Sequence, residues 1–169
     1  MKLVVVLFFF LFIFQACQKE NQFSPIPEIR LLAFNQIVGQ DLKDSSGELK
    51  IGFTDGDGDM GLLPEDTLPP YQVQGNFYYN FVVKYFEKQQ GNWIEINTLP
   101  NGNPLINSAR IPNITPSGQR KTLEGEISIS LFTNNPFSTF DTIRYECFIY
   151  DRALNKSNTI QTNEIVIKK

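Results

Sequence analysis

The chain has 169 residues, enough for one domain with a substantial core, and it is rich in aromatic side chains, with 15 Phe and 6 Tyr. Its 18 acidic and 15 basic residues give a net charge of −3, which argues against nucleic-acid binding. The sequence contains no histidine. It therefore lacks the most common general base, the usual nitrogen ligand of zinc and the usual catalytic triad, and we expect no enzymatic activity.

The N-terminal segment predicts export from the cytoplasm. Lys2 precedes twelve apolar residues, 3–14, and the small residue Ala16 precedes Cys17. The apolar stretch is shorter than the about 20 residues needed to span a bilayer. Its FQAC ending resembles the lipobox of bacterial lipoproteins, which implies cleavage of residues 1–16 and acylation of Cys17, for example with palmitate. An ordinary cleaved signal and an uncleaved anchor are the alternatives.

A polar stretch that ends in two prolines follows the cysteine, and we interpret residues 17–27 as a lipidated flexible tether. Residues 28–169 then form a single domain. Within it, short segments rich in β-branched and aromatic residues alternate with Gly, Asn and Pro, and no long helical periodicity is present. The predicted strands lie near residues 29–38, 48–53, 77–87, 93–97, 123–132, 142–150 and 159–167.

This pattern predicts an all-β fold, an immunoglobulin-like antiparallel β-sandwich of about seven strands. The segment 88–92 contains Gly91 and predicts a hairpin, and the strand before it is expected in the middle of a sheet. Cys147 alternates with apolar neighbours and is expected to be a buried thiol without a disulfide partner. Two connections, 54–76 and 98–121, greatly exceed the usual length of about 4–6 residues, so they are candidate functional loops.

The first of these loops carries an acidic motif. Asp55, Asp57 and Asp59 alternate with glycines in FTDGDGDMG, so their carboxylates repel one another unless a cation binds them. The oxygen ligands and the D-x-D-x-D spacing favour Ca²⁺, and Asp66 stands where an EF-hand loop has its bidentate acid. Met60 at the glycine position shows that the motif is not an EF-hand. A solvated Asp-Gly turn is the alternative interpretation.

Further ligands for such a site are expected from another loop. The second and sixth predicted strands run in the same direction, so the loops that follow them share one end of the sandwich. This arrangement places Asp151 and Asn155 near the aspartates. A pair of catalytic carboxylates, as in carbohydrate-active enzymes, is the less favoured reading, because adjacent loop aspartates do not define the fixed separation that glycosidases need.

The order of these motifs, from the lipobox through FTDGDGDMG to the final IYDRALNKSNTIQT, resembles an uncharacterised immunoglobulin-like outer-membrane lipoprotein family of Bacteroidota. The resemblance implies a lipid anchor in the outer membrane. Lys19-Glu20 after Cys17 is similar to the export signal for the cell surface in this phylum, and a periplasm-facing domain is the alternative. Asp66-Thr67-Leu68 matches its O-glycosylation signature, with Thr67 the acceptor, and Thr142 is a second, weaker match.

Two functions follow from this reading. The first is a membrane-anchored, non-catalytic binding or adhesion module, stabilised by calcium, that recognises a protein or a glycan. The second is a structural accessory subunit of an outer-membrane protein assembly, which would use exposed sheet edges or the aromatic loop 71–79.

Overall fold

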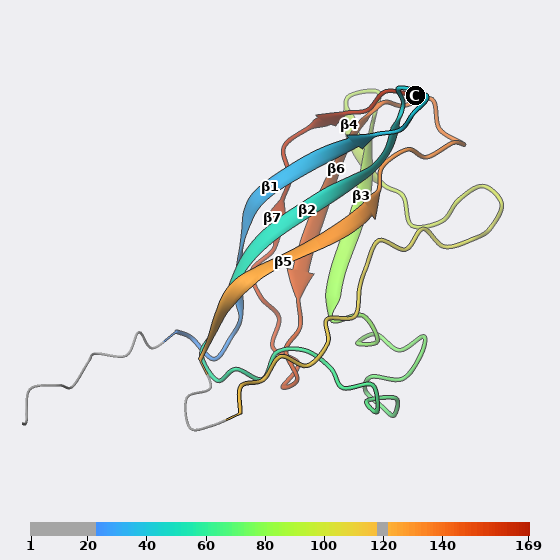
Figure 1. The fold of residues 1–169 in the computed structure, drawn as a ribbon. Coiled ribbons are helices and arrows are strands. Elements are labelled where there is room, and N and C mark those ends of the chain that lie inside the picture. Colours follow the sequence, from blue (N-terminus) through green and yellow to red (C-terminus); the bar gives the residue numbers. More distant parts are fainter. Residues whose placement is uncertain (1–22, 118–121) are drawn as a thin grey trace, which may run out of the picture.

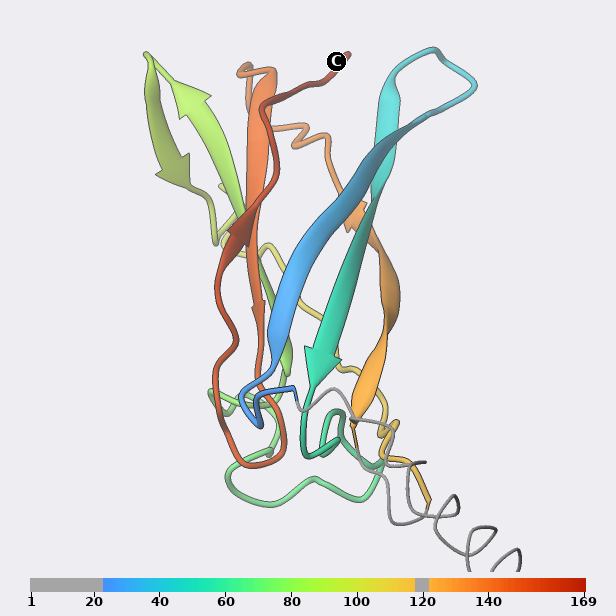
Figure 2. The same cartoon turned by 90° about the vertical axis from the view of Figure 1, so that its left-hand side faces the viewer.

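The computed structural model describes residues 23–117 and 122–169, and all of its regular structure is β-strand. The strands form two antiparallel sheets packed face to face as a sandwich, which confirms the predicted fold class (Figures 1 and 2). They are β1 (Glu28–Val38), β2 (Asp44–Asp55), β3 (Phe81–Gln89), β4 (Asn92–Glu95), β5 (Leu123–Phe132), β6 (Thr142–Ile149), β7 (Ile160–Gln161) and β8 (Ile165–Val166). This part of the chain has no helix long and apolar enough to cross a bilayer.

The strand order is that of an immunoglobulin-like sandwich. One sheet has the order β1-β2-β5, and the other has the order β4-β3-β6-β7, with β8 also paired to β6. β2 is paired with β1 and β5 over residues 46–54, and its two ends are paired on one side each, Asp44 with Val38 on β1 and Asp55 with Leu123 on β5. The position of Asp55, the first residue of the acidic motif, is therefore fixed by the sheet.

The core lies between the two sheets and follows the period-two alternation of their strands. The core includes Leu49, Ile51 and Phe53 of β2, Phe81, Val83 and Tyr85 of β3, and Ile143, Tyr145, Cys147 and Ile149 of β6. Cys147 is a free, buried cysteine, as the alternation predicts, and burial raises the pKa of its thiol to about 12. A thiol held in the neutral form in this way is an inert part of the core.

β3 lies inside its sheet between β4 and β6, and the hairpin at 88–92 joins β3 to β4, so both predictions are confirmed. β3 begins only at Phe81, however, although residues 77–80 are rich in aromatic side chains. The reason is pairing: Phe81 lies opposite Ile149, the last residue of β6, so the residues before it have no partner strand.

The last predicted strand, 159–167, forms two short strands, β7 and β8, instead of one. Between them, the hydroxyl of Thr162 accepts a hydrogen bond from the backbone N–H of Tyr145 at 3.0 Å. The Thr162 side chain thus takes the backbone N–H of Tyr145, which would otherwise pair with a backbone carbonyl of a continuous strand. The strand is interrupted at this point.

The predicted signal peptide, Cys17 and residues 18–22 lie outside the described residues. The described part of the predicted tether, 23–27, contacts the domain. The backbone N–H of Gly56 donates to the carbonyl oxygen of Ser24 at 2.8 Å, and Pro27 is buried. The chain therefore enters the sandwich beside the acidic motif, at the end where Figures 1 and 2 place the 62–80 loop between β2 and β3.

Candidate metal centre

The acidic motif forms a tight turn at the end of β2, and its two glycines serve different purposes. Gly58 has a φ of 65°, a left-handed conformation that favours glycine. A side chain at Gly56 would instead collide with the carbonyl oxygens of Phe23 and Ser24. Glycine is therefore favoured at position 58 by the backbone conformation and at position 56 by close packing.

Met60 anchors the far side of this turn. Its side chain is fully buried in the core, and its carbonyl oxygen accepts a hydrogen bond from Ile114 at 3.2 Å. The next residues, Gly61 and Leu62, lie against the segment around Pro112. The backbone N–H of Leu62 donates to the carbonyl oxygen of Ile111 at 2.9 Å, and the carbonyl oxygen of Leu62 accepts the N–H of Asn113 at 3.0 Å. The acidic turn is thus held on both sides, by the sheet before it and by the core after it.

The turn brings the three predicted aspartates together. Ligand oxygens of Asp55, Asp57 and Asp59 all lie within 4.8 Å of one another. Two oxygens on opposite sides of a calcium ion are separated by about twice the calcium–oxygen distance of 2.3–2.6 Å, so this spacing fits one shared cation.

Four buried oxygen atoms of these carboxylates lack hydrogen-bond donors. Asp55 is fully buried, and neither of its carboxylate oxygens has a hydrogen-bond partner. Oδ1 of Asp57 and Oδ1 of Asp59 are also buried without a partner. Buried charged groups normally have partners, because an uncompensated buried charge is very costly. The four oxygen atoms together form a cluster of acceptors that a metal ion can satisfy.

The pKa values of the aspartates in the turn also show that their negative charges are not compensated. Burial, followed by the adjacent carboxyl of Asp57, raises the pKa of Asp55 to about 7. The pKa of Asp59 is also raised, first by burial and then by the charge of Asp151. The metal-free turn therefore favours uptake of a proton, and a cation would relieve the same repulsion.

Asp151 joins this group from the loop after β6, as the strand directions predict. It is buried, and its charge acts on both Asp55 and Asp59. Asn155 holds its carboxylate through a backbone N–H at 2.7 Å and a side-chain amide at 2.8 Å. The backbone N–H of Ala153 donates to Oδ2 of Asp59 at 3.1 Å, which ties the two loops together.

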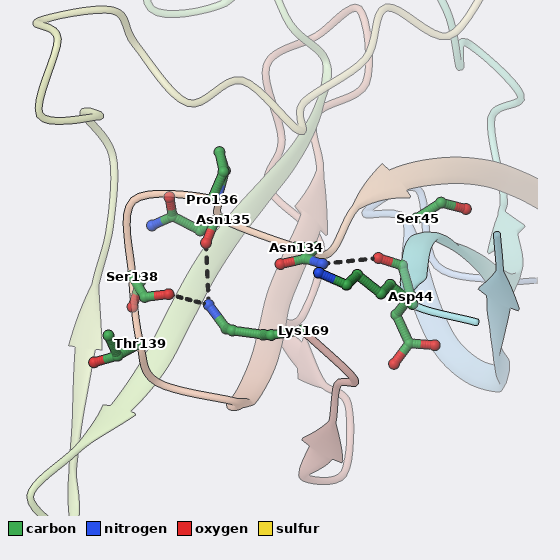
Figure 3. Close-up of a pocket in the computed structure, with 9 residues that line it drawn as sticks. Asp44, Ser45, Asn134, Asn135, Pro136, Ser138, Thr139 and Lys169 are labelled. Carbon is green, nitrogen blue, oxygen red and sulfur yellow. Dashed lines mark hydrogen bonds between the residues drawn. The ribbon is translucent and has the colours of Figure 1, made fainter. Parts of the chain in front are cut away.

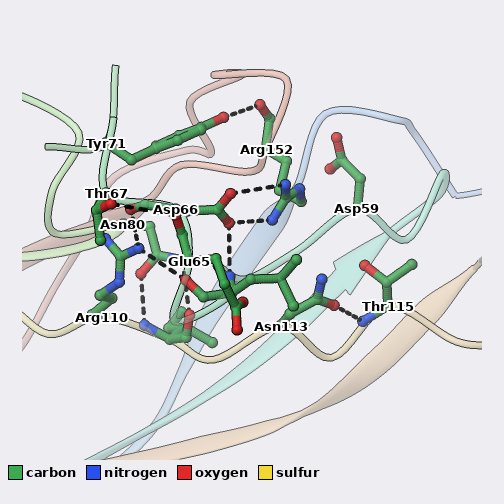
Figure 4. A network of polar contacts seen from close by, with 12 residues as sticks. Asp59, Glu65, Asp66, Thr67, Tyr71, Asn80, Arg110, Asn113, Thr115 and Arg152 are labelled. Carbon is green, nitrogen blue, oxygen red and sulfur yellow. Dashed lines mark hydrogen bonds and ion pairs between the residues drawn. The ribbon is translucent and has the colours of Figure 1, made fainter. Parts of the chain in front are cut away.

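Asp66, the other predicted ligand, does not join this group. Its carboxylate is paired with both terminal nitrogens of the Arg152 guanidinium, one of them at 3.2 Å, and it also accepts the backbone N–H of Leu63 at 2.7 Å (Figure 4). The Arg152 hydrogen bonds lower the pKa of the Asp66 carboxyl. Thr67, the predicted glycosylation site, is exposed on the same loop, and Thr142 is the first residue of β6.

Two arginines that hold the loops around the acidic turn were not anticipated from the sequence. Arg152 directly follows Asp151 and links the acidic turn to the 62–80 loop, and Arg110 binds the same loop from the other side (Figure 4). Arginines in irregular loops have no periodic pattern, so no sequence signal points to these contacts. The burial of Glu87 was not anticipated either, although a signal for it exists, because Glu87 continues the buried face of β3 after Phe81, Val83 and Tyr85.

The opposite end of the sandwich has a different character. A polar hollow of about 640 Å³ lies there, between the β1–β2 turn, the β5–β6 loop and the C-terminal residue (Figure 3). Lys169 crosses it and donates to the carbonyl oxygens of Asn135, at 3.0 Å, and Ser138. The side-chain amide of Asn134 donates to the carbonyl oxygen of Asp44 at 3.1 Å. The polar groups of this hollow are thus largely bonded to one another.

Comparison with protein-family models, with curated proteins and with solved structures finds no match to this chain.

Proposed function

We propose that the chain is a membrane-anchored lipoprotein with a non-catalytic immunoglobulin-like binding module. Calcium stabilises its loop end, the end of the sandwich that carries the acidic turn and the 62–80 loop. The observation that carries the proposal is the set of buried carboxylate oxygens on Asp55, Asp57 and Asp59 that have no hydrogen-bond donor. The absence of histidine and the inert state of Cys147 support a binding role over a catalytic one.

Calcium fits this donor set better than other biological metals. All candidate ligands are oxygen atoms, which hard cations prefer, whereas the chain has no histidine and the cysteine among the described residues, Cys147, is buried away from zinc. Calcium also accepts irregular geometry with 6–8 ligands, whereas magnesium requires a near-ideal octahedron. Asp151 and nearby backbone carbonyls are the candidate ligands beyond the three aspartates.

Titration of the purified protein with calcium chloride tests the metal proposal. We expect saturable heat of binding in a calorimeter and a higher melting temperature in calcium than in EDTA. At a hundredfold excess over the dissociation constant, binding adds about 2.7 kcal/mol to the free energy of unfolding. No heat and no change in melting temperature at millimolar calcium would refute it.

The anchor is a separate part of the proposal. Acylated Cys17 would place the domain at the outer membrane, with the cell surface favoured over the periplasmic face by Lys19-Glu20, and membership of the Bacteroidota family stays a prediction. Replacement of Cys17 by Ser should release the protein from membranes into the soluble fraction. Full retention on membranes would contradict lipidation.

One observation favours the alternative function, an accessory subunit of an outer-membrane assembly. Within the described residues β5 pairs only with β2, so its outer edge is available to another strand up to Phe132, whose backbone N–H donates to the Asn107 side chain at 2.9 Å. An apolar groove of about 360 Å³ runs beside it, lined by Phe53, Phe81, Ile111, Ile127 and Ile129. Crosslinking from Ser128 in intact cells tests this alternative, which predicts a discrete adduct that persists in EDTA.

A further inference from the structure

The 62–80 loop is held to the rest of the molecule by two arginines. Arg110 donates to the carbonyl oxygens of Leu63 at 3.1 Å, Asp66 at 2.6 Å and Tyr78 at 3.1 Å. Its guanidinium also lies over the Tyr78 ring, 5.3 Å from the centroid. Arg110 belongs to the segment before β5 and forms no hydrogen bond to the acidic turn. Its contacts with the loop therefore do not depend on Asp55, Asp57 or Asp59.

Arg152 makes the second set of contacts, and these also reach the metal centre. Its guanidinium forms a two-pronged ion pair with Asp66, and its carbonyl oxygen accepts a hydrogen bond from the Tyr71 hydroxyl (Figure 4). Its backbone N–H donates to the carbonyl oxygen of Asp59 at 3.3 Å. Arg152 therefore contacts one candidate ligand and directly follows another, Asp151.

We propose that occupancy of the metal centre controls the order of the 62–80 loop through Arg152. This inference rests on the proposed calcium site. A bound ion holds Asp59 and Asp151 together and fixes the backbone of Arg152 between them. Without the ion, the like charges of the turn repel one another, the backbone around Arg152 loosens, and the ion pair with Asp66 no longer holds the loop in one position.

The loop that responds to the ion carries much of the apolar surface at this end of the sandwich. Leu63, Leu68 and Val73 are 40%, 75% and 64% exposed. Calcium would therefore determine how these side chains are presented, and it would do so without contacting them. The coupling is reciprocal, so a change that frees the loop from Arg152 also weakens calcium binding modestly.

Hydrogen exchange of the full-length protein, followed by mass spectrometry in calcium and in EDTA, tests the coupling. We expect calcium to slow exchange of amides in residues 62–80 on the order of tenfold, with calorimetry on the same samples reporting binding. In Arg152→Met, calcium should still bind, while most of the calcium-dependent difference in loop exchange should be lost, because only the bond from the Tyr71 hydroxyl to the backbone carbonyl at position 152 remains. Asp66→Asn breaks the same ion pair from the loop side and should give the same result, which covers failure of Arg152→Met to fold.

Arg110→Met is the matched control. It should speed loop exchange in both conditions and leave the difference between calcium and EDTA intact, since Arg110 does not touch the acidic turn. Calcium binding with unchanged loop exchange in the wild type would overturn the coupling and leave the proposed function standing. A full calcium response in Arg152→Met or Asp66→Asn would also overturn it. Failure of calcium to bind the wild type would overturn both proposals.

Discussion

Buried carboxylates occur at both ends of the sandwich, and the two sites differ in the donors around them. Glu87, toward the end of β3, is 1% exposed, and its carboxylate accepts hydrogen bonds from four side chains, those of Tyr85, Gln89, Asn135 and Ser138. Asp55, at the other end, is equally buried and has no donor. A buried charge that the protein satisfies itself is a structural element, whereas one without donors is relieved by a proton or by a cation from outside.

The largest expected effect comes from the satisfied site. Glu87→Ala leaves four side-chain donors without their acceptor and opens a gap between β3 and the β5–β6 loop. We expect a loss of about 3–5 kcal/mol in the free energy of unfolding, measured by denaturant titration. The loss should be equal in calcium and in EDTA. A loss that appeared only in calcium would mean that Glu87 belongs to the metal centre.

The opposite sign is expected at the unsatisfied site. Asp57→Asn removes one of the mutually repelling charges, so the metal-free protein should gain about 1–2 kcal/mol of stability. The same variant should lose the stabilisation by calcium, because a ligand is missing. Thermal melting in EDTA and in calcium measures both changes.

Asp41→Asn is the control for this experiment, since Asp41 is exposed in the β1–β2 turn at the far end. It should leave both melting temperatures close to those of the wild type. A destabilised metal-free Asp57→Asn protein would indicate instead that the aspartates form favourable hydrogen bonds in a solvated turn.

The pH dependence of the metal-free protein follows from Asp55. Its pKa is raised from the ordinary 3.8 to about 7, so the stabilising effect of its protonated form is complete below 3.8 and is lost as the pH rises through about 7. We expect the melting temperature in EDTA to fall from about pH 5 to about pH 8, a window in which ordinary carboxylates stay ionised. Saturating calcium should flatten this slope, and a metal-free protein most stable near pH 8 would contradict the explanation.

The smallest effect is expected at Asp66. Asp66→Asn should weaken calcium binding by less than about tenfold, which corresponds to about 1.4 kcal/mol, because the structure pairs Asp66 with Arg152. Asp59→Asn should weaken binding roughly a hundredfold or more, as expected for a direct ligand. Calorimetric titration of both variants distinguishes the roles, and equal losses would place Asp66 in the coordination sphere.

Much of the fold was accessible from sequence because alternation and turn residues report local geometry. Residues 123–132 were predicted to be a strand with the observed boundaries of β5, in which apolar residues and polar or small residues alternate. Where the prediction was wrong, long-range pairing decided the structure. Residues 77–80 lack a partner strand, and Thr162 interrupts the final strand through a contact with Tyr145.

The candidate site divides in the same way. Asp55, Asp57 and Asp59 were found because they are adjacent in sequence, and the approach of Asp151 followed from strand direction. The partner of Asp66 was missed, because the ion pair with Arg152 joins two irregular loops that no periodic pattern relates. The contact of Gly56 with Ser24 was missed for the same reason.

A crystal structure of the protein grown in millimolar calcium tests the central claim most directly, since it reports the position and ligands of any bound ion. We predict one ion among Asp55, Asp57 and Asp59, with calcium–oxygen distances of about 2.3–2.6 Å and its identity established by anomalous scattering. Carboxylates hydrogen-bonded only to water or to each other under these conditions would contradict a metal-stabilised loop end.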